Sequence, residues 1–247
     1  MRVFYISDIH LPEGTAPAAR RFADFVKSVP QPRDTLVLGG DIFDLFVGNK
    51  KIFREKFAEA LQAIRGAGER GITVHYLEGN HDFHLASAFA HTPSFHFHAD
   101  DFSFNADGKK FYVSHGDLID EEDRGYRLLR RVTKNRPFQL FVQAIPNIVV
   151  DKIGTWSSRH SRKYTRTEGM GGENQKRIRG LYLEFAKEKV KQGANFVLVG
   201  HSHLRDQIQI KEEGKSGEYI NLGYSADSLN YAVWTEGEER FTLKQYP

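Results

Sequence analysis

The sequence predicts a layered α/β fold in a single domain spanning residues 1–247. Three observations support this: short apolar runs rich in β-branched and aromatic residues, amphipathic segments between several of them, and alternating polar and apolar residues after position 204. At 247 residues, with 40% hydrophobic and 27% charged residues, the chain is long enough for a sizeable core. Its composition is not that of a disordered protein.

Each element follows from one of these patterns. Five apolar runs closed by Gly or charged residues predict buried strands: residues 2–6, 35–40, 72–79, 110–116 and 195–201. Apolar residues at helical spacing predict three helices: residues 17–29, 50–69 and 173–192. The alternating stretches QIQI, EYINLG, YAVWTE and RFTLKQY predict antiparallel strands that complete a second sheet.

Residues 122–170 fit neither pattern and carry most of the positive charge. We expect a helical cap insertion without strands; a kinked core helix around Pro146 is the alternative. Residues 124–166 contain eleven Lys or Arg and one acid, Asp151, which gives this segment a net charge of +10. Because the whole chain has a net charge of +3, the remaining residues carry −7. Such a patch suits a phosphorylated ligand, an anionic membrane surface or nucleic acid, although a solvated helix face has the same composition. No nucleic-acid motif is present, and we expect no nucleic-acid partner.

Composition also limits the chemistry. Without cysteine there is no disulfide and no thiolate metal site, so any metal must be held by His, Asp, Glu or Asn. No stretch reaches the roughly eighteen apolar residues of a spanning helix, and no signal peptide is recognisable. We therefore expect a cytoplasmic protein without a membrane span.

Polar residues follow each of the five predicted strands, in the strings SDIH, GGDIFD, GNHD, SHGD and GHSH. Ligands bind at the carboxyl ends of strands in layered α/β sheets, so these groups are expected to converge. Seven of them suit divalent cations and would fill two metal positions about 3.5–4 Å apart, with Asp41 bridging: Asp8, His10, Asp41, Asn80, His115, His201 and His203. We expect His81 to lie beside the metals as a proton donor, and Asp82 to cap a helix beginning at FHLASAF.

Together these motifs resemble the calcineurin-like metallophosphoesterases, in the same order and over nearly the whole chain. The resemblance implies a four-layer α/β/β/α sandwich. It assigns the first metal to Asp8, His10, Asp41 and His203, and the second to Asp41, Asn80, His115 and His201. Two cations would activate water and polarise a phosphoryl group. His81 would then donate a proton to a phosphoryl oxygen or the leaving group, with Asp44 orienting it.

Within that superfamily the chain is most similar to the UDP-2,3-diacylglucosamine diphosphatases of lipid A biosynthesis. The similarity rests on length, on HGDLIDEEDRGYRLLRR and on the apolar and basic cap before GHSH. It implies a nucleotide-linked glycolipid substrate, cleavage to UMP and 2,3-diacylglucosamine 1-phosphate, two Mn²⁺ ions, and peripheral contact with the cytoplasmic face of a Gram-negative inner membrane. No obligate protein partner is predicted. Asp123 and Tyr126 match substrate contacts, and the cap adds candidates Ser161, Arg162 and Lys163.

Alternatives follow from particular residues. His81 stands where this narrower family often carries Arg, so a nucleotide or another phosphate ester is the alternative substrate, and a binding scaffold on an inactive fold is a third interpretation. The apolar cap residues could simply be core. The remaining histidines are interpreted as structural or surface residues, with His96 and His98 on the exposed face of a strand rather than in a third metal site: His75, His84, His91, His96, His98 and His160.

Overall fold

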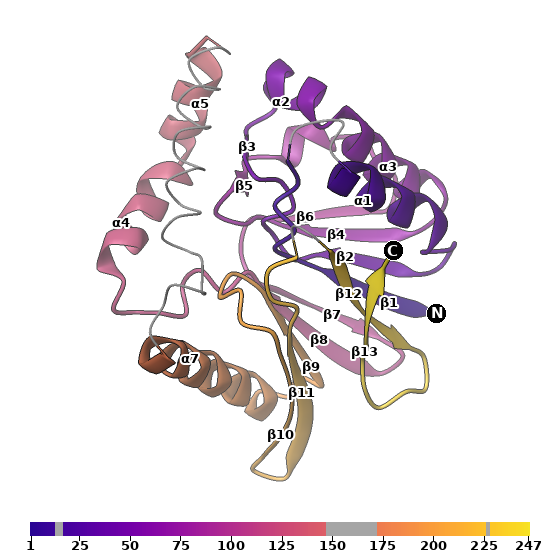
Figure 1. Ribbon diagram of the computed structural model, residues 1–247, viewed down its shortest axis with the longest axis vertical. Helices are drawn as coiled ribbons and strands as arrows, with labels where there is room; N and C mark the ends of the chain where they lie inside the picture. Colours follow the sequence, from indigo (N-terminus) through magenta and orange to yellow (C-terminus); the bar gives the residue numbers. More distant parts are fainter. Residues whose placement is uncertain (13–16, 147–171, 226–227) are drawn as a thin grey trace.

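Two β-sheets stacked face to face form the centre of the molecule (Figure 1). A computed structural model describes residues 1–12, 17–146, 172–225 and 228–247. Within these residues the first sheet has the order β13-β12-β1-β2-β4-β6, with bounds Thr242–Tyr246, Leu229–Thr235, Arg2–Ile6, Thr35–Leu38, Thr73–Leu77 and Phe95–His98. The second has the order β10-β11-β9-β8-β7, with bounds Asp206–Glu212, Lys215–Asn221, Phe196–Val199, Lys109–Ser114 and Phe102–Ala106.

Helices cover both outer faces and complete the expected four layers. Three pack on the first sheet: α1 (Pro17–Ser28), α2 (Lys51–Lys56) and α3 (Ala58–Glu69). On the second sheet lies α7 (Gly172–Lys191). Both faces of the central strands are therefore buried, which explains their continuous apolar sequences. In β1, for example, Phe4 packs toward the helices and Tyr5 toward the other sheet.

One predicted helix is interrupted. The sequence predicts a continuous helix over residues 50–69, but Phe57 separates α2 from α3 with φ −111° and ψ 22°. Its ring lies 4.7 Å from that of Phe43 and 5.8 Å from that of Phe46, in the core below the helices. The break accompanies burial of this aromatic side chain, an outcome that helical periodicity alone does not reveal.

The C-terminal strands divide between the two sheets, so the prediction that all four complete a second sheet was wrong. β10 and β11 do extend the second sheet, whereas β12 pairs antiparallel with β1 and β13 pairs with β12 in the first sheet. Burial explains the position of β12, because Trp234 enters the core between the sheets and Val233 packs toward the helices. Strand β7 was not predicted, nor was the short parallel pair β3 (Phe46–Val47) and β5 (Asp82–Phe83).

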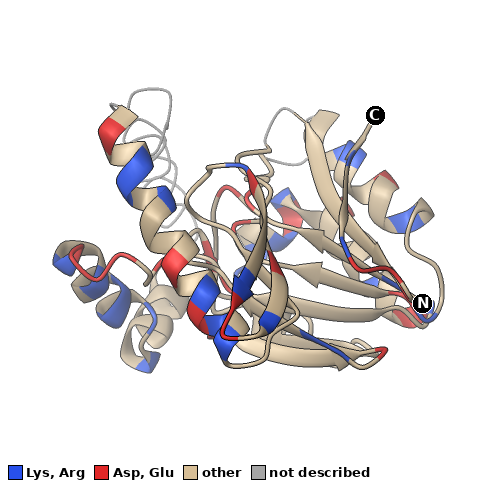
Figure 2. Ribbon diagram, turned by 90° about the horizontal axis from the view of Figure 1, so that it is seen from below, with Lys and Arg blue, Asp and Glu red and all other residues tan. Residues whose placement is uncertain are grey.

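The described part of the expected cap consists of two helices beside the sandwich, α4 (Arg124–Thr133) and α5 (Arg136–Ala144) (Figure 1). No residue of α4 is buried, and only Val142 is buried in α5, so neither is a core helix. Figure 2 shows basic residues gathered on α4, whereas acidic and basic residues are mixed along α7. Among the described residues, no helix is long and apolar enough to cross a membrane. The division into one domain with a cap over residues 122–170 stays a prediction.

Candidate metal centre

The loops that follow β1, β2, β4, β8 and β9 meet at one edge of the two sheets and bring the predicted ligands together. β1, β2 and β4 run parallel, as do β8 and β9, so their carboxyl ends coincide. Three groups of side chains have potential ligand atoms within 4.8 Å of one another: Asp8 with His10 and His203, Asp41 with His115 and His201, and His10 with Asp44 and His81.

The first group surrounds one side of Asp41. Nε2 of His10 lies 3.3 Å from Nε2 of His203 and 3.6 Å from Oδ2 of Asp41. Oδ1 of Asp8 is 3.7 Å from Nε2 of His203. Within the described residues, Oδ2 of Asp8 is buried without a hydrogen-bond partner. An unpartnered buried carboxylate oxygen is costly, and a cation bound among these groups would satisfy it.

The second group lies on the other side of the same carboxylate. Oδ1 of Asn80 is 2.9 Å from both Nε2 of His115 and Nδ1 of His201. Nε2 of His115 lies 3.6 Å from Oδ2 of Asp41. That oxygen is thus equally distant from His10 in the first group and His115 in the second, which is the position required of a bridging ligand.

The backbone adopts unusual conformations to aim these side chains. Left-handed φ values, between 42° and 65°, occur at five of the predicted ligands: Asp8, His10, Asp41, His201 and His203. Such conformations cost free energy in non-glycine residues and tend to cluster at functional sites. Two motif glycines permit close approach, because a Cβ atom at Gly79 would lie 2.1 Å from Oδ1 of Asp41 and one at Gly200 would lie 2.5 Å from Oδ2 of Asp8.

Asp82 holds two of the ligand loops together rather than capping a helix. Its buried carboxylate accepts five hydrogen bonds, at distances of 2.7–3.3 Å. One donor is the hydroxyl of Tyr76, and the others are the backbone N–H groups of Asp41, Ile42, Phe43 and Gly79. Asp82 itself lies in β5, so the predicted N-cap was wrong although its structural role was not. Burial, followed by the charge of Asp41, raises the pKa of Asp82 to about 6.

Burial and neighbouring charges shift the pKa values of several predicted ligands, in the direction that suits metal binding at His10, His201 and Asp41 and in the opposite direction at His115. Burial lowers the pKa of His10 to about 3 and, together with His115, lowers the pKa of His201 to about 4. Burial alone would raise the pKa of Asp41, but the surrounding histidines, led by His115, leave it below its ordinary value. For His115, burial acts to lower the pKa, but the nearby carboxylates, led by Asp41, outweigh burial, so the pKa is raised. Neutral imidazoles and ionised carboxylates are the forms that bind cations.

His81 lies beside both groups. Its ring is 4.8 Å from that of His10 and nearly perpendicular to it. Nδ1 lies 2.7 Å from the backbone carbonyl oxygen of Asp44, so the main chain of Asp44 orients the imidazole. A carboxylate oxygen of Asp44 also lies within 4.8 Å of ring nitrogens of His10 and His81. The catalytic roles assigned to His81 and Asp44 stay predictions.

The cap contributes Tyr126 to the edge of the centre. Its ring lies 5.9 Å from that of His201, and its hydroxyl donates to Oδ2 of Asp117 at 2.5 Å. The side chain of Asp123 accepts from the backbone N–H of Tyr126 and thereby caps α4. Sequence reasoning gave no role to Asp117, although it stands in the HGD motif and follows His115 by two residues. The candidates Ser161, Arg162 and Lys163 lie outside the described residues.

Three of the other histidines, His75, His96 and His98, gather at the edge between the sheets. His96 is exposed as expected, but the ring of His98 stacks 3.6 Å from that of Phe102 on β7. Nδ1 of His75 lies 3.0 Å from Nε2 of His98. The exposed-face prediction therefore holds for His96 and only in part for His98, because the second sheet covers the latter.

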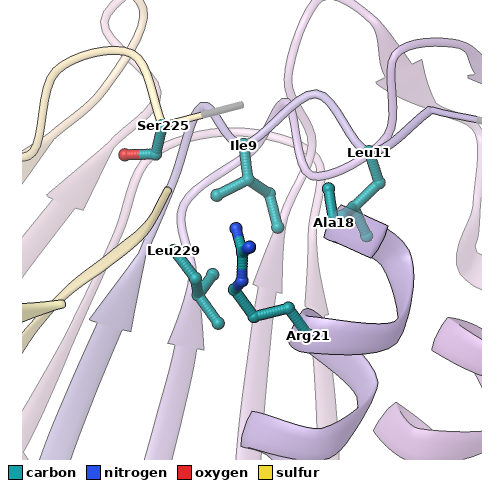
Figure 3. Close-up of a pocket in the computed structure, with 6 residues that line it drawn as sticks. All are labelled: Ile9, Leu11, Ala18, Arg21, Ser225 and Leu229. Carbon is teal, nitrogen blue, oxygen red and sulfur yellow. The ribbon is translucent and has the colours of Figure 1, made fainter. Parts of the chain in front are cut away.

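A small pocket lies behind the loop that carries His10 (Figure 3). None of the predicted metal ligands lines it; the lining residues are Ile9, Leu11, Ala18, Arg21, Ser225 and Leu229. In Figure 3 the hydroxyl of Ser225 points away from the guanidinium of Arg21. Four of its six lining residues are apolar.

Known proteins match the chain over most of its length. Residues 1–205 match the model of the calcineurin-like phosphoesterase family. The UDP-2,3-diacylglucosamine hydrolase of Aeromonas salmonicida strain A449 is 33% identical over 258 aligned positions, covering 100% of this chain and 95% of that protein. The hydrolases of the same name from Stutzerimonas stutzeri strain A1501 and Psychromonas ingrahamii are 28% and 24% identical, covering 90% and 94% of this chain and 90% and 92% of their own lengths.

Proposed function

The chain belongs to the calcineurin-like phosphoesterase family, and from that premise we propose that it hydrolyses the pyrophosphate bond of UDP-2,3-diacylglucosamine. The products would be UMP and 2,3-diacylglucosamine 1-phosphate. The observation that carries the phosphoesterase chemistry is the carboxylate of Asp41, whose Oδ2 lies 3.6 Å from Nε2 of both His10 and His115. The choice of substrate rests on the relatives and on the character of the cap.

The residues present suit two divalent cations. Imidazole nitrogens with carboxylate and amide oxygens bind Mn²⁺, Fe²⁺, Zn²⁺ or Co²⁺, and we propose Mn²⁺ for the native enzyme. The first ion would be held by Asp8, His10, Asp41 and His203, and the second by Asp41, Asn80, His115 and His201. When bound, such a pair activates water and neutralises charge on the phosphoryl oxygens.

His81 would supply the proton. Because Nδ1 faces the carbonyl oxygen of Asp44, it carries the N–H, and Nε2 is the ring nitrogen that would face the substrate. When the imidazole is protonated, Nε2 can donate to a phosphoryl oxygen or to the leaving group. A carboxylate oxygen of Asp44 lies within 4.8 Å of ring nitrogens of His81 and His10, where it would help to position the imidazole.

The cap suits an acylated, anionic substrate. Large apolar side chains on α4 and α5 are 49–64% exposed: Leu128, Leu129, Val132, Leu140 and Phe141. Basic residues stand among them, including Arg131 and Arg136. We propose that acyl chains contact the apolar side chains, and that the basic residues hold the enzyme peripherally on the anionic cytoplasmic face of the inner membrane. Asp123 and Tyr126, with Ser161, Arg162 and Lys163, are the proposed substrate contacts.

The first test is hydrolysis of UDP-2,3-diacylglucosamine by the Mn²⁺-loaded protein, with products identified by mass, beside the soluble diester bis-p-nitrophenyl phosphate. We expect rapid release of UMP and the lipid monophosphate, with slow turnover of the soluble diester. Fast turnover of the diester with none of the lipid would retain the phosphoesterase chemistry and reject the substrate. That result would favour the alternative, a nucleotide or another phosphate ester, for which His81 is the supporting observation.

A His81→Ala variant separates an enzyme from a metal-holding scaffold. We expect it to bind Mn²⁺ normally, because His81 is not among the proposed ligands, and to lose about 10²–10⁴-fold in turnover. Metal content by elemental analysis provides the control. Unchanged turnover with full metal content would remove His81 from the mechanism.

A further inference from the structure

Tyr224 is an exposed aromatic residue at the edge of the metal centre. It is 43% exposed, and its ring lies 5.1 Å from that of His203 and 5.6 Å from that of His10. The two rings that it approaches belong to the first predicted metal position. A half-exposed tyrosine contributes little to the core, so its position over two predicted ligands requires another explanation.

The backbone on both sides of this tyrosine is tied to the ligand loops. The N–H of Gly223 donates to Oδ1 of Asn221 at 2.9 Å, and Nδ2 of Asn221 donates to Oγ of Ser202 at 3.0 Å. On the other side, the N–H of Ser225 donates to the carbonyl oxygen of Asp8 at 3.1 Å. The turn therefore presents its aromatic ring from a fixed position, as a binding surface requires.

A cation lies beside the same turn. Gly223 has φ +70°, and a Cβ atom there would approach Cβ of Arg205 to 3.0 Å and its backbone nitrogen to 3.2 Å. Glycine thus allows the turn to pack closely against Arg205, which is itself exposed. An exposed arginine, two residues after His203, therefore packs against the same turn that carries Tyr224.

The cap lies at the other predicted metal position. Tyr126 of α4 has its ring 5.9 Å from that of His201, whereas Tyr224 neighbours His10 and His203. In phosphoryl transfer the attacking water and the leaving half lie roughly in line across phosphorus, and the other half is a further substituent on that phosphorus, so the two halves extend in different directions from it. If the acylated half contacts the cap, the nucleotide half extends toward Tyr224.

We propose that Tyr224 is the platform on which the base of the nucleotide half stacks, with Arg205 contacting its oxygen atoms. This inference rests on the proposed function, because it takes the substrate to have an acylated half and a nucleotide half. Aromatic side chains stack on any planar base, and a guanidinium group can donate to carbonyl or phosphate oxygens. Tyr224 would therefore determine affinity for a base-containing product rather than for phosphate alone.

The test compares UMP with ribose 5-phosphate, which retains the sugar and phosphate but has no base. Each is titrated calorimetrically into Mn²⁺-loaded protein and used to inhibit hydrolysis of bis-p-nitrophenyl phosphate. The wild type is expected to bind UMP more tightly. Tyr224→Ala should weaken UMP binding about tenfold and leave ribose 5-phosphate binding unchanged, since base stacking is worth roughly 1–3 kcal/mol. Tyr224→Phe should retain the preference, and Tyr246→Ala on β13, where the ring packs against Phe25, should not alter it.

Two results would overturn this inference. One is an unchanged preference for UMP in Tyr224→Ala. The other is an equal loss of both ligands, which would mean that the ring only supports His10 and His203. Hydrolysis of UDP-2,3-diacylglucosamine by the wild type is scored separately. If the wild type hydrolyses the lipid but its preference for UMP does not depend on Tyr224, only the stacking role of Tyr224 is rejected. If the preference for UMP depends on Tyr224 but the lipid is not hydrolysed, only the proposed substrate is rejected.

Discussion

The metal centre and the cap are built in opposite ways. Asp8, Asp41 and His115 are at most 2% exposed, and their loops are joined by hydrogen bonds between segments far apart in the sequence. In the cap, no residue of α4 is buried, and Phe141 of α5 is 60% exposed. The centre is thus an extension of the sandwich core, whereas the cap is a surface attached to it. We therefore expect that substitutions in the centre alter the chemistry and that substitutions on the cap surface alter substrate choice.

A buried lysine attaches the second cap helix. Nζ of Lys50, which is 7% exposed, donates to the carbonyl oxygens of Val142, Gln143 and Ile145 at 2.8, 3.2 and 2.5 Å. These carbonyl groups lie at the C-terminal end of α5, where backbone acceptors lack helical partners and a cation is favourable.

The first cap helix is attached through residues adjacent to the metal centre. Arg130 donates from Nε to Oδ2 of Asp117 at 2.8 Å, and Nζ of Lys134 lies 3.5 Å from Oε2 of Glu78. Asp117 follows His115 by two residues, and Glu78 precedes Asn80 by two. The contact between the two regions is therefore made by a few ion pairs whose carboxylates are buried close to the proposed ligands.

The largest effect is expected from breaking the centre at Asp82. Asp82→Ala leaves several buried backbone donors without an acceptor, each costing about 1–3 kcal/mol, so the free energy of unfolding should fall by about 4 kcal/mol. Metal binding should weaken as well, because the Asp41 and Asn80 loops lose their common acceptor. Urea denaturation and Mn²⁺ titration measure the two effects.

Two variants control this experiment. Asp82→Asn retains one acceptor oxygen and should cost less than the alanine variant. Asp24→Ala, on the exposed surface of α1, should change stability by no more than about 0.5 kcal/mol. Equal stabilities of the Asp82→Ala and Asp24→Ala proteins would show that this carboxylate does not hold the loops together.

The difference between the regions also explains what sequence could predict. Residue types at strand ends predicted the convergence of the centre, because metal ligands require particular side chains. The role of Asp82 was missed because its acceptor atoms serve donors forty residues away, beyond any local pattern. Alternation predicted β12 as a strand but not its pairing with β1, since partner choice depends on which core receives Trp234. Tyr224 carries no motif, and only its position reveals it.

An intermediate effect is expected at the contact between the regions. Lys134→Met leaves the Glu78 carboxyl buried without its cation, which should cost about 2 kcal/mol at pH 8. Burial already raises the pKa of Glu78 despite Lys134, and the substitution raises it further. Because the pKa of Glu78 is higher in the folded than in the unfolded protein, the folded protein loses stability as the pH rises above the ordinary pKa of glutamate. The deficit relative to wild type should therefore be larger at about pH 8 than at about pH 4.5, the ordinary pKa of glutamate.

Lys51→Met is the matched control, because Lys51 pairs with Glu55 on the exposed surface of α2. Its denaturation midpoint should follow that of the wild type at every pH. A pH-independent deficit in Lys134→Met would indicate lost packing rather than an uncompensated carboxylate, and would remove Glu78 from the account of how the cap is attached.

The smallest effect on stability, and the most selective effect on function, is expected at the outer surface of the cap. Phe141→Ser should change the free energy of unfolding by less than about 0.5 kcal/mol, because the ring is already 60% exposed, whereas Phe53→Ser in the core should cost about 3–5 kcal/mol. If Phe141 contacts acyl chains, its replacement should slow lipid hydrolysis and weaken sedimentation with vesicles containing anionic phospholipid, while turnover of the soluble diester stays constant. A loss of stability comparable to that of Phe53→Ser would show that the cap is a core element, and the contrast between the two regions would then fail.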